Sequence, residues 1–189
     1  MVTLREVQAA DADTILAWRN CAEVSRYMFT DQVITPEQHA TWFQRVSDDR
    51  RHKLWIIVAE SKNVGLANLY DIDWDNRRCY WGSYIADPGQ RGRGIGSATE
   101  LLVLSFVFDR LLLNKLNCEV LSFNTMAIAV HMKFGFTKEG LLRQHVYKSG
   151  RYHDVVSLGV LRQEWQERKH GLADGVRQKC PGMQLPSYF

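Results

Sequence analysis

The spacing of apolar residues changes repeatedly along the chain between the two-residue period of strands and the 3.6-residue period of helices. Alternating or short apolar runs predict strands at residues 3–7, 54–59, 66–74, 79–85, 116–121, 144–148 and 152–161. Helical spacing predicts helices after residue 11, from 35 through 46, from 95 to 112 and from 124 to 134. Because strands outnumber helices and the two interleave, we expect an α/β (α+β) fold built on a central sheet.

Capping residues mark where several of these helices begin and end. Asp11 precedes a helical pattern and is expected to cap it, and Thr35 stands before Pro36, a residue favoured in the first helical position. Asn124 is expected to cap the next helix, which Gly135 ends because glycine readily adopts the left-handed conformation found after helices.

The length and composition predict one folded domain. The 189 residues contain no internal repeat and no linker-like stretch, so residues 1–169 are interpreted as a single domain. The glycine, proline and polar content from His170 onward predicts a loosely held tail over residues 170–189. Lys and Arg number 24 and Asp and Glu 21, giving a net charge of +3. Nucleic-acid-binding domains carry a stronger basic cluster, so no nucleic-acid partner is expected.

Membrane, secretion and metal signals are weak. No apolar run approaches the roughly 20 residues that cross a bilayer, and the N-terminal residues do not resemble a signal peptide. The cysteines are scattered, as in proteins of a reducing compartment, at Cys21, Cys79, Cys118 and Cys180. The histidines lack metal-ligand spacing. We therefore expect a cytoplasmic protein with no membrane partner and no metal.

The stretch most informative about chemistry is a glycine-rich turn between the strand at 79–85 and the helix from 95. Glycines allow a ligand to approach the backbone closely, while a helix N-terminus and nearby arginines supply positive charge. The turn therefore predicts a phosphate site, most simply for a pyrophosphate; a tight turn without a ligand is the alternative. The spacing fits neither the dinucleotide nor the Walker motif. The candidate residues are Arg91, Gly92, Arg93, Gly94, Ile95, Gly96 and Ser97.

This turn matches the R/Q-x-x-G-x-G/A signature of the GCN5-related N-acetyltransferases (GNAT superfamily). The strand before it, the long helix after it, the segment 119–124 and the Lys133–Phe136 ending fall in that family's order, so the resemblance covers residues 2–168. It implies acetyl transfer from acetyl-CoA to an amine. It also implies a mixed, mostly antiparallel sheet of six to seven strands, with a splayed fourth and fifth pair and about four flanking helices.

The same resemblance implies how acetyl-CoA is held. Its pyrophosphate would lie on the amides of residues 91–97, and its pantetheine arm in the gap beside the strand at 80–86, which carries a bulge in the family. Backbone amides near Ile85 would then polarise the thioester carbonyl. Asn124 would contact the cofactor arm, an alternative to its role as a plain helix cap or one compatible with it.

The reaction needs a base for the attacking ammonium and an acid for the departing thiolate. Glu119 is the candidate base, since some family members resemble it with a catalytic glutamate there; a surface strand glutamate is the alternative. His131 occupies a position where many members have a tyrosine, and is a candidate general acid. Tyr84 is the alternative donor.

The acceptor is indicated by the first third of the chain, which resembles PseH-like nucleotide-amino-sugar N-acetyltransferases, with features of RimJ/RimL-like ribosomal-protein acetyltransferases. This implies a UDP-linked 4-amino-4,6-dideoxy sugar as acceptor. Arg19 would pair with its diphosphate, and Met28, His39 and Trp42 would surround a ring. Ordinary core packing is the alternative for these residues.

Three further interpretations stay open. The chain could acetylate a protein N-terminus, or a polyamine or aminoglycoside, or it could bind CoA without catalysis. A homodimer is also left open.

Overall fold

A seven-stranded sheet forms the centre of the protein. The computed structural model describes residues 1–181 and 183–189. The strand order is β1-β2-β3-β4-β5-β7-β6, and every neighbouring pair is antiparallel except the parallel pair β4–β5. The bounds are β1 Val2–Glu6, β2 Lys53–Ala59, β3 Lys62–Asp73, β4 Arg78–Ile85, β5 Lys115–Leu121, β6 Thr137–Lys148 and β7 Arg151–Leu161. The mixed, mostly antiparallel sheet is thus confirmed, with β6 longer than its predicted core of 144–148.

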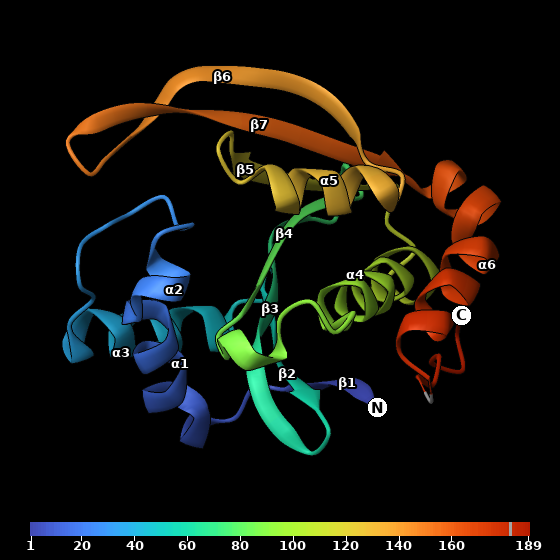
Figure 1. Cartoon of the computed structure of the whole chain (residues 1–189), viewed down its shortest axis with the longest axis horizontal. Helices are drawn as coiled ribbons and strands as arrows, with labels where there is room; N and C mark the ends of the chain where they lie inside the picture. The colour runs from blue at the N-terminus through green and yellow to red at the C-terminus, as the bar shows by residue number, and fades with distance from the viewer. Residues whose placement is uncertain (182) are drawn as a thin grey trace.

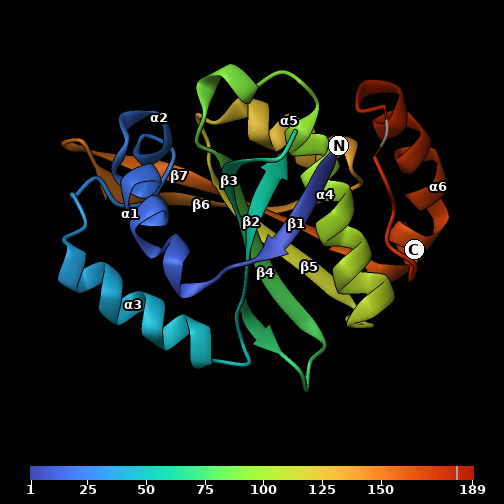
Figure 2. The same cartoon turned by 90° about the horizontal axis from the view of Figure 1, so that it is seen from below.

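Helices cover both faces of this sheet (Figures 1 and 2). The first three lie together on one face, and α4 and α6 lie side by side on the other. Their bounds are α1 Ala12–Asn20, α2 Ala22–Ser25, α3 Pro36–Asp48, α4 Ile95–Ser105, α5 Thr125–Lys133 and α6 Arg162–Lys179. Six α-helices therefore replace the expected four or so, and none in the described residues is long and apolar enough to cross a membrane. The helix predicted for 95–112 ends its regular part at Ser105 and continues as a π-helical turn, Phe106–Arg110.

The predicted helix ends are mostly confirmed. Thr35 Oγ1 accepts from Gln38 N at 3.3 Å in a capping box, and Asn124 Oδ1 accepts from Ala127 N at 3.4 Å. Gly135 has a φ of +94°. Asp11 is the exception, because its carboxylate binds Arg5 and a backbone amide of the preceding turn and makes no cap for α1.

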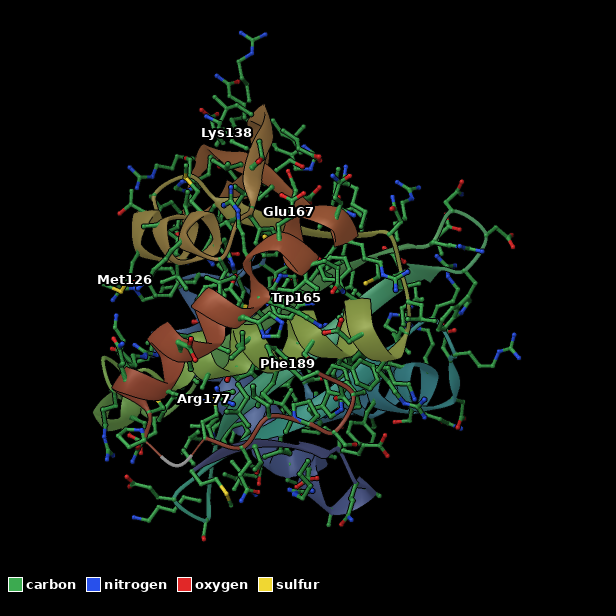
Figure 3. All side chains as sticks on the ribbon, turned by 90° about the vertical axis from the view of Figure 1, so that its right-hand side faces the viewer. Met126, Lys138, Trp165, Glu167, Arg177 and Phe189 are labelled. Atoms are coloured by element: carbon green, nitrogen blue, oxygen red, sulfur yellow. The ribbon has the colours of Figure 1, made fainter. Side chains whose placement is uncertain are left out.

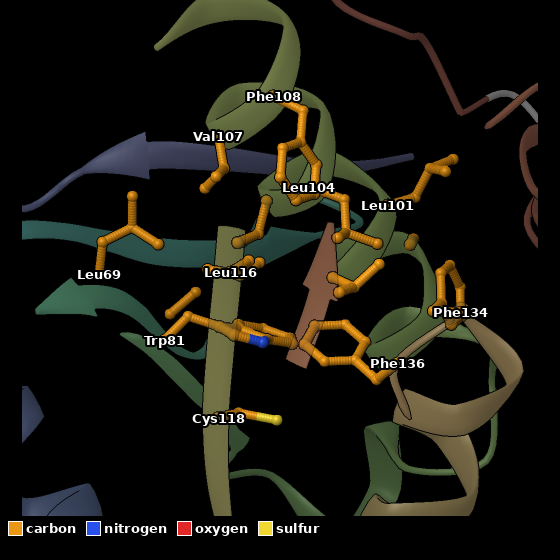
Figure 4. Close-up of a cluster of buried hydrophobic side chains, with 14 of the residues drawn as sticks. Leu69, Trp81, Leu101, Leu104, Val107, Phe108, Leu116, Cys118, Phe134 and Phe136 are labelled. Atoms are coloured by element: carbon orange, nitrogen blue, oxygen red, sulfur yellow. The ribbon is translucent and has the colours of Figure 1, made fainter. Parts of the chain in front are cut away.

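The main core lies between the sheet and α4 (Figure 4). Leu69 and Leu116 from the sheet meet Leu101, Leu104 and Phe108 from α4 and the turn after it, and all five are at most 1% exposed. Each such side chain contributes about 1.5–3 kcal/mol when fully buried. This packing holds α4, and with it the glycine turn, in a fixed place on the sheet.

The parallel pair β4–β5 separates after a short start. Pairing runs only from Arg78–Lys115 to Tyr80–Asn117, although both strands continue beyond it. At the last pair the Asn117 side chain donates to Cys79 O at 3.0 Å. The expected splay is therefore present.

The irregularity expected in the strand at 80–86 lies at its very end. The β3–β4 register is regular from Gly65–Ile85 to Tyr70–Tyr80, and a further irregularity lies between Tyr70 and Asp73 on β3. Directly after Ile85, the amides of Ala86 and Asp87 both donate to Val64 O, at 2.8 and 3.5 Å, so two residues oppose one there, as in a bulge.

The C-terminal residues differ from the loose tail expected from His170. Helix α6 continues to Lys179, and its inner face buries Ala173 and Val176 against the core (Figure 3). Met183 is also buried in the core. A Cβ on Gly171 or Gly175 would meet open space, so packing of the apolar face of α6 outweighs the low helix propensity of these two glycines.

The last residue contributes to this packing. The Phe189 ring lies edge-on to Trp165 at 6.0 Å and to His170 at 5.7 Å, with Lys169 Nζ 5.1 Å from its centroid. We predict that Phe189→Ala lowers the free energy of unfolding by about 1–3 kcal/mol. Urea denaturation measures it, with Ser187→Ala, an exposed neighbour, as the control. Equal stability of both variants would mean that the end of the chain is not docked in solution.

Candidate active site

The glycine turn presents a row of backbone N–H groups at the start of α4. Gly92 and Gly94 have φ values of +75° and +80°, which residues other than glycine rarely adopt. The first backbone bond into the helix is donated by Ala98 N to Gly94 O at 2.9 Å. In the described chain, no protein acceptor pairs with the N–H groups of residues 92–97. A Cβ placed on Gly92 or Gly96 would meet open space. The turn is therefore a fitting cradle for a pyrophosphate.

Arg91 serves a different purpose from the one expected. Its amide donates to Pro88 O, and its guanidinium donates to Ile85 O at 2.9 and 3.2 Å. The same guanidinium binds the Glu23 carbonyl and carboxylate, each at 3.1 Å. Arg91 thus ties the end of β4 to α2. Arg93 makes exposed contacts to Gln90 at 2.7 Å and to Glu60 at 2.6 Å, which water weakens.

The end of α6 closes the outer side of the turn, a contact that the sequence did not suggest. Cys180 Sγ donates to Arg93 O at 3.4 Å. A Cβ on Gly94 would lie 2.8 Å from this sulfur. Gly94 is therefore required both by its φ and by its neighbour.

Ile85 offers a free amide to the gap between the splayed strands. Ala86 N donates to Val64 O at 2.8 Å, so Gly65–Ile85 is a non-hydrogen-bonded pair of the β3–β4 ladder. In such a pair the N–H and C=O groups point away from the partner strand. Those of Ile85 consequently point to the β5 side, where Arg91 binds the carbonyl and the N–H stays available.

Glu119 lies on β5 two residues beyond the last β4–β5 pair, opposite Ser157 of β7. Its side chain is half-buried and forms no hydrogen bond or ion pair with the described residues. Glu119 also lies near Tyr70 of β3. The pKa of Tyr70 is raised well above its usual range, first by burial and then by the charge of Glu119. An unpaired carboxylate beside the gap can accept a proton.

His131 is fixed by a buried carboxylate. Its Nδ1 lies 2.8 Å from Glu100 Oε1, and Glu100 on α4 is 1% exposed. Burial raises the pKa of Glu100, and His131 opposes that rise. The His131 ring also meets Trp81 of β4 at 5.3 Å and Phe136 at 5.4 Å. The sequence indicated His131, whereas nothing in it indicated Glu100 as its partner.

Tyr84 lies on the other face of β4 from Trp81, because side chains alternate along a strand. It packs with Trp18, Trp42 and the cluster under α1 and α3, and its hydroxyl is buried with no partner in the described residues. Burial raises the pKa of Tyr84 far above its usual range, although nearby Arg19 lowers it. The two acid candidates therefore do not meet.

The expected acceptor residues separate into two groups. Arg19 lies near Tyr84 and donates to Thr30 Oγ1 at 2.9 Å. His39 and Trp42 pack together at 5.2 Å on α3, where burial lowers the pKa of His39 and leaves its Nε2 without a partner in the described chain. No described contact joins Met28 to either group.

The tip of the β6–β7 hairpin closes over this region. Lys148 is 5% exposed, and its Nζ donates to Ser25 O at 2.9 Å and Thr30 O at 3.1 Å. Ser149 N donates to Asp31 at 2.7 Å. The turn residues were predicted, but their docking site more than a hundred residues away was not.

An open hollow lies at the end of β5, and its residues were also missed. Phe123 is edge-on to His153 at 5.1 Å and stacks on Tyr27 at 6.4 Å. Asp154 lines the same hollow and accepts from Gln144 N at 2.7 Å. In the described residues, no group of three or more His, Cys, Asp or Glu could hold a metal ion.

Comparisons with known proteins agree with this geometry. Residues 1–137 match the family model described as "Acetyltransferase (GNAT) domain". An uncharacterised N-acetyltransferase from a Bacillus subtilis prophage is 33% identical over 69% of this chain and 72% of its own length. A spermidine N(1)-acetyltransferase of Escherichia coli K12 is 24% identical over 87% of this chain and 88% of its own.

A similar fold has also been solved. The crystal structure of spermidine N-acetyltransferase from Vibrio cholerae in complex with CoA and spermine superposes with a TM-score of 0.82 at 23% identity, covering 87% of this chain and 98% of that one. These matches support the expected superfamily and cofactor. They do not support the expected likeness to PseH-like sugar enzymes.

The turn's two types of glycine can be separated by mutation. We predict that Gly94→Ala lowers the free energy of unfolding by about 1–3 kcal/mol, since alanine there is strained and clashes with Cys180. It should also weaken CoA binding, measured by calorimetry. Gly96→Ala is the control: its Cβ enters open space in the first helical turn, so stability should be equal or slightly higher. Equal losses in both variants would contradict this interpretation.

Proposed function

The chain belongs to the GNAT acetyltransferase family and is thus an acetyl-CoA-dependent acyltransferase, and on that premise we propose that it acetylates a primary amine of a small molecule. The amine would attack the thioester directly, in a ternary complex. The observation that carries this proposal is the unpaired stretch of β4 and β5 directly beside the free N–H groups of the turn.

The turn and the gap are proposed to hold acetyl-CoA. The amides of Gly92 to Ser97 would bind the pyrophosphate, while Asn124, already a helix cap, has its side-chain amide left for the cofactor arm. Bound acetyl-CoA supplies an activated acyl group and a thiol that leaves. The Ile85 N–H would stabilise negative charge on the carbonyl oxygen, because it is preorganised toward the gap.

Glu119 is proposed as the base. It belongs to the part of β5 that is no longer paired with β4, and its carboxylate has no partner in the described chain, so it can take a proton from an ammonium directly or through a water molecule. His131 is proposed as the acid in preference to Tyr84. It contacts Trp81, the first residue of β4 after the pairing ends, whereas the Tyr84 hydroxyl is buried with a raised pKa.

A polyamine is the first acceptor class that we propose. Its support is the match, over most of the chain, to relatives named as spermidine N-acetyltransferases. The carboxylate of Glu119, which has no partner in the described residues, provides negative charge for such a cation. The net charge of the chain decides nothing here, because the local groups dominate over a Debye length of about 8–10 Å.

An amine carried on an anion, such as a nucleotide-linked amino sugar, is the second candidate. One specific observation favours it: two cations, Arg19 and Lys148, converge on Thr30 at the edge of the acceptor side. A guanidinium suits a diphosphate but repels a polyamine.

The acceptor can be decided by release of free thiol from acetyl-CoA with spermidine, a UDP-4-amino-4,6-dideoxy sugar or an N-terminal peptide. We predict turnover with spermidine, and a KM for spermidine that falls or stays equal in Arg19→Ala. The second candidate, the nucleotide-linked amino sugar, would be supported instead if spermidine were not turned over and the KM for the sugar rose in Arg19→Ala. Turnover of the peptide alone would overturn both.

The base can be tested with an uncharged variant of the same shape. We predict that Glu119→Gln lowers kcat at neutral pH by roughly one to three orders of magnitude, because a positioned base is lost. The KM for acetyl-CoA should change little. Glu167→Gln, an exposed change on α6 (Figure 3), should leave kcat equal. An unchanged rate in Glu119→Gln would show that another group takes the proton.

A further inference from the structure

The pair formed by Glu100 and His131 is unusual for its degree of burial. Glu100 belongs to α4, the helix that begins at the glycine turn, and is 1% exposed; His131 belongs to α5, and its side chain is 14% exposed. A carboxylate in such a place is costly unless a charged or hydrogen-bonding partner compensates it. In the described residues the imidazole is the only such partner of Glu100.

The surroundings of the pair are otherwise apolar. Trp81 comes from β4 and Phe136 from the link between α5 and β6, and neither side chain can titrate (Figure 4). From β5 comes the Cys118 thiol, whose pKa is raised well above its usual range by burial and then by Glu100. Cys118 thus stays a neutral thiol, and it adds no charge to the Glu100–His131 pair.

The contact also decides which nitrogen of the ring is free. Nδ1 is the atom 2.8 Å from Glu100, so it carries the hydrogen when the carboxylate is charged. Nε2 has no described protein partner, and it is not among the buried polar atoms that lack one. The ring packs on Trp81, the first β4 residue beyond the last β4–β5 pair, which places it at the start of the gap.

We propose that Glu100 is a positioning residue for His131: it holds Nδ1–H and thereby keeps the Nε2–H of the protonated ring available as the acid at the gap. This inference rests on the proposed function. In the acid step the Nε2–H bond breaks and its electron pair stays on the ring, while the proton goes to the sulfur of the departing thiolate. The ring is left neutral with Nδ1–H still on Glu100, and it regains its proton from solvent.

The charge of the carboxylate also makes its hydrogen bond with Nδ1 a strong one. Replacing it with a neutral amide weakens that bond, so the ring is held less firmly with Nε2 at the gap. We predict that Glu100→Gln lowers kcat about tenfold or more, with the KM for acetyl-CoA equal within about twofold.

Ser105→Ala is the matched control. Ser105 lies on the same helix, is fully buried and has an unpaired hydroxyl in the described chain, so its removal tests general disturbance of α4. Its kcat and its KM for acetyl-CoA should equal those of the unmodified protein. Equal loss of kcat and thermal stability in Glu100→Gln and Ser105→Ala, or an unchanged kcat in Glu100→Gln, would overturn the proposal.

His131→Asn covers the case in which Glu100→Gln does not fold. Its side-chain amide can donate to Glu100 in place of Nδ1, but it leaves no donor in place of Nε2. We expect kcat to fall as in Glu100→Gln, and the double variant to lose no more than His131→Asn alone. An additive loss would show that Glu100 acts independently of His131.

A measurement without acetyl-CoA separates this inference from the proposed function. ¹⁵N-resolved NMR of the histidine rings should show the hydrogen of His131 on Nδ1, slowly exchanging, and faster exchange in Glu100→Gln. An Nδ1 that carries no hydrogen would overturn the role of Glu100 whatever the enzyme acetylates. Absence of thiol release with every amine would instead overturn the proposed function, and the NMR result would still stand.

Discussion

The site depends on the separation of two parallel strands that remain attached at one end. Three residue pairs join β4 to β5, and Asn117 adds a side-chain bond to Cys79 at the point where they part. Beyond it, backbone groups that a sheet would normally satisfy internally face a gap, and leaving such groups buried and unpaired is costly. A ligand with its own amides can satisfy them. The binding site is therefore an incomplete sheet, held open by the rigid core on either side.

Arg91 shows how the turn and the strand are kept in register. Its guanidinium joins the Ile85 carbonyl to both the backbone and the carboxylate of Glu23, so one side chain orients the end of β4, the glycine turn and α2. Fixing the Ile85 carbonyl also fixes the neighbouring N–H, the group proposed to face the thioester. The role assigned to this arginine is therefore to orient the backbone, since its guanidinium binds groups of the protein itself.

The sequence predicted the parts of the site that lie close together along the chain. The glycine turn, the Asn124 cap and the succession of strands and helices along the chain followed from local patterns and a family signature. Contacts between distant segments could not be predicted. Nothing near Lys148 indicates that it binds Ser25 and Thr30, and nothing near Cys180 indicates the Arg93 carbonyl. The tail was misjudged for the same reason, because glycine content is a local signal and the apolar face of α6 matters only against a partner.

The burial of Glu100 also depends on a contact between segments that are distant in the sequence. A leucine at that place in α4 would fit the core and cost nothing, as buried ion pairs rarely add stability over apolar packing. A carboxylate is tolerated there because α5 brings His131 within hydrogen-bond distance. The two residues thus depend on each other, and they join the helix that carries the phosphate cradle to the helix that borders the gap. The position of one imidazole ring therefore depends on both helices, because its Nδ1 is held by α4 while its backbone belongs to α5.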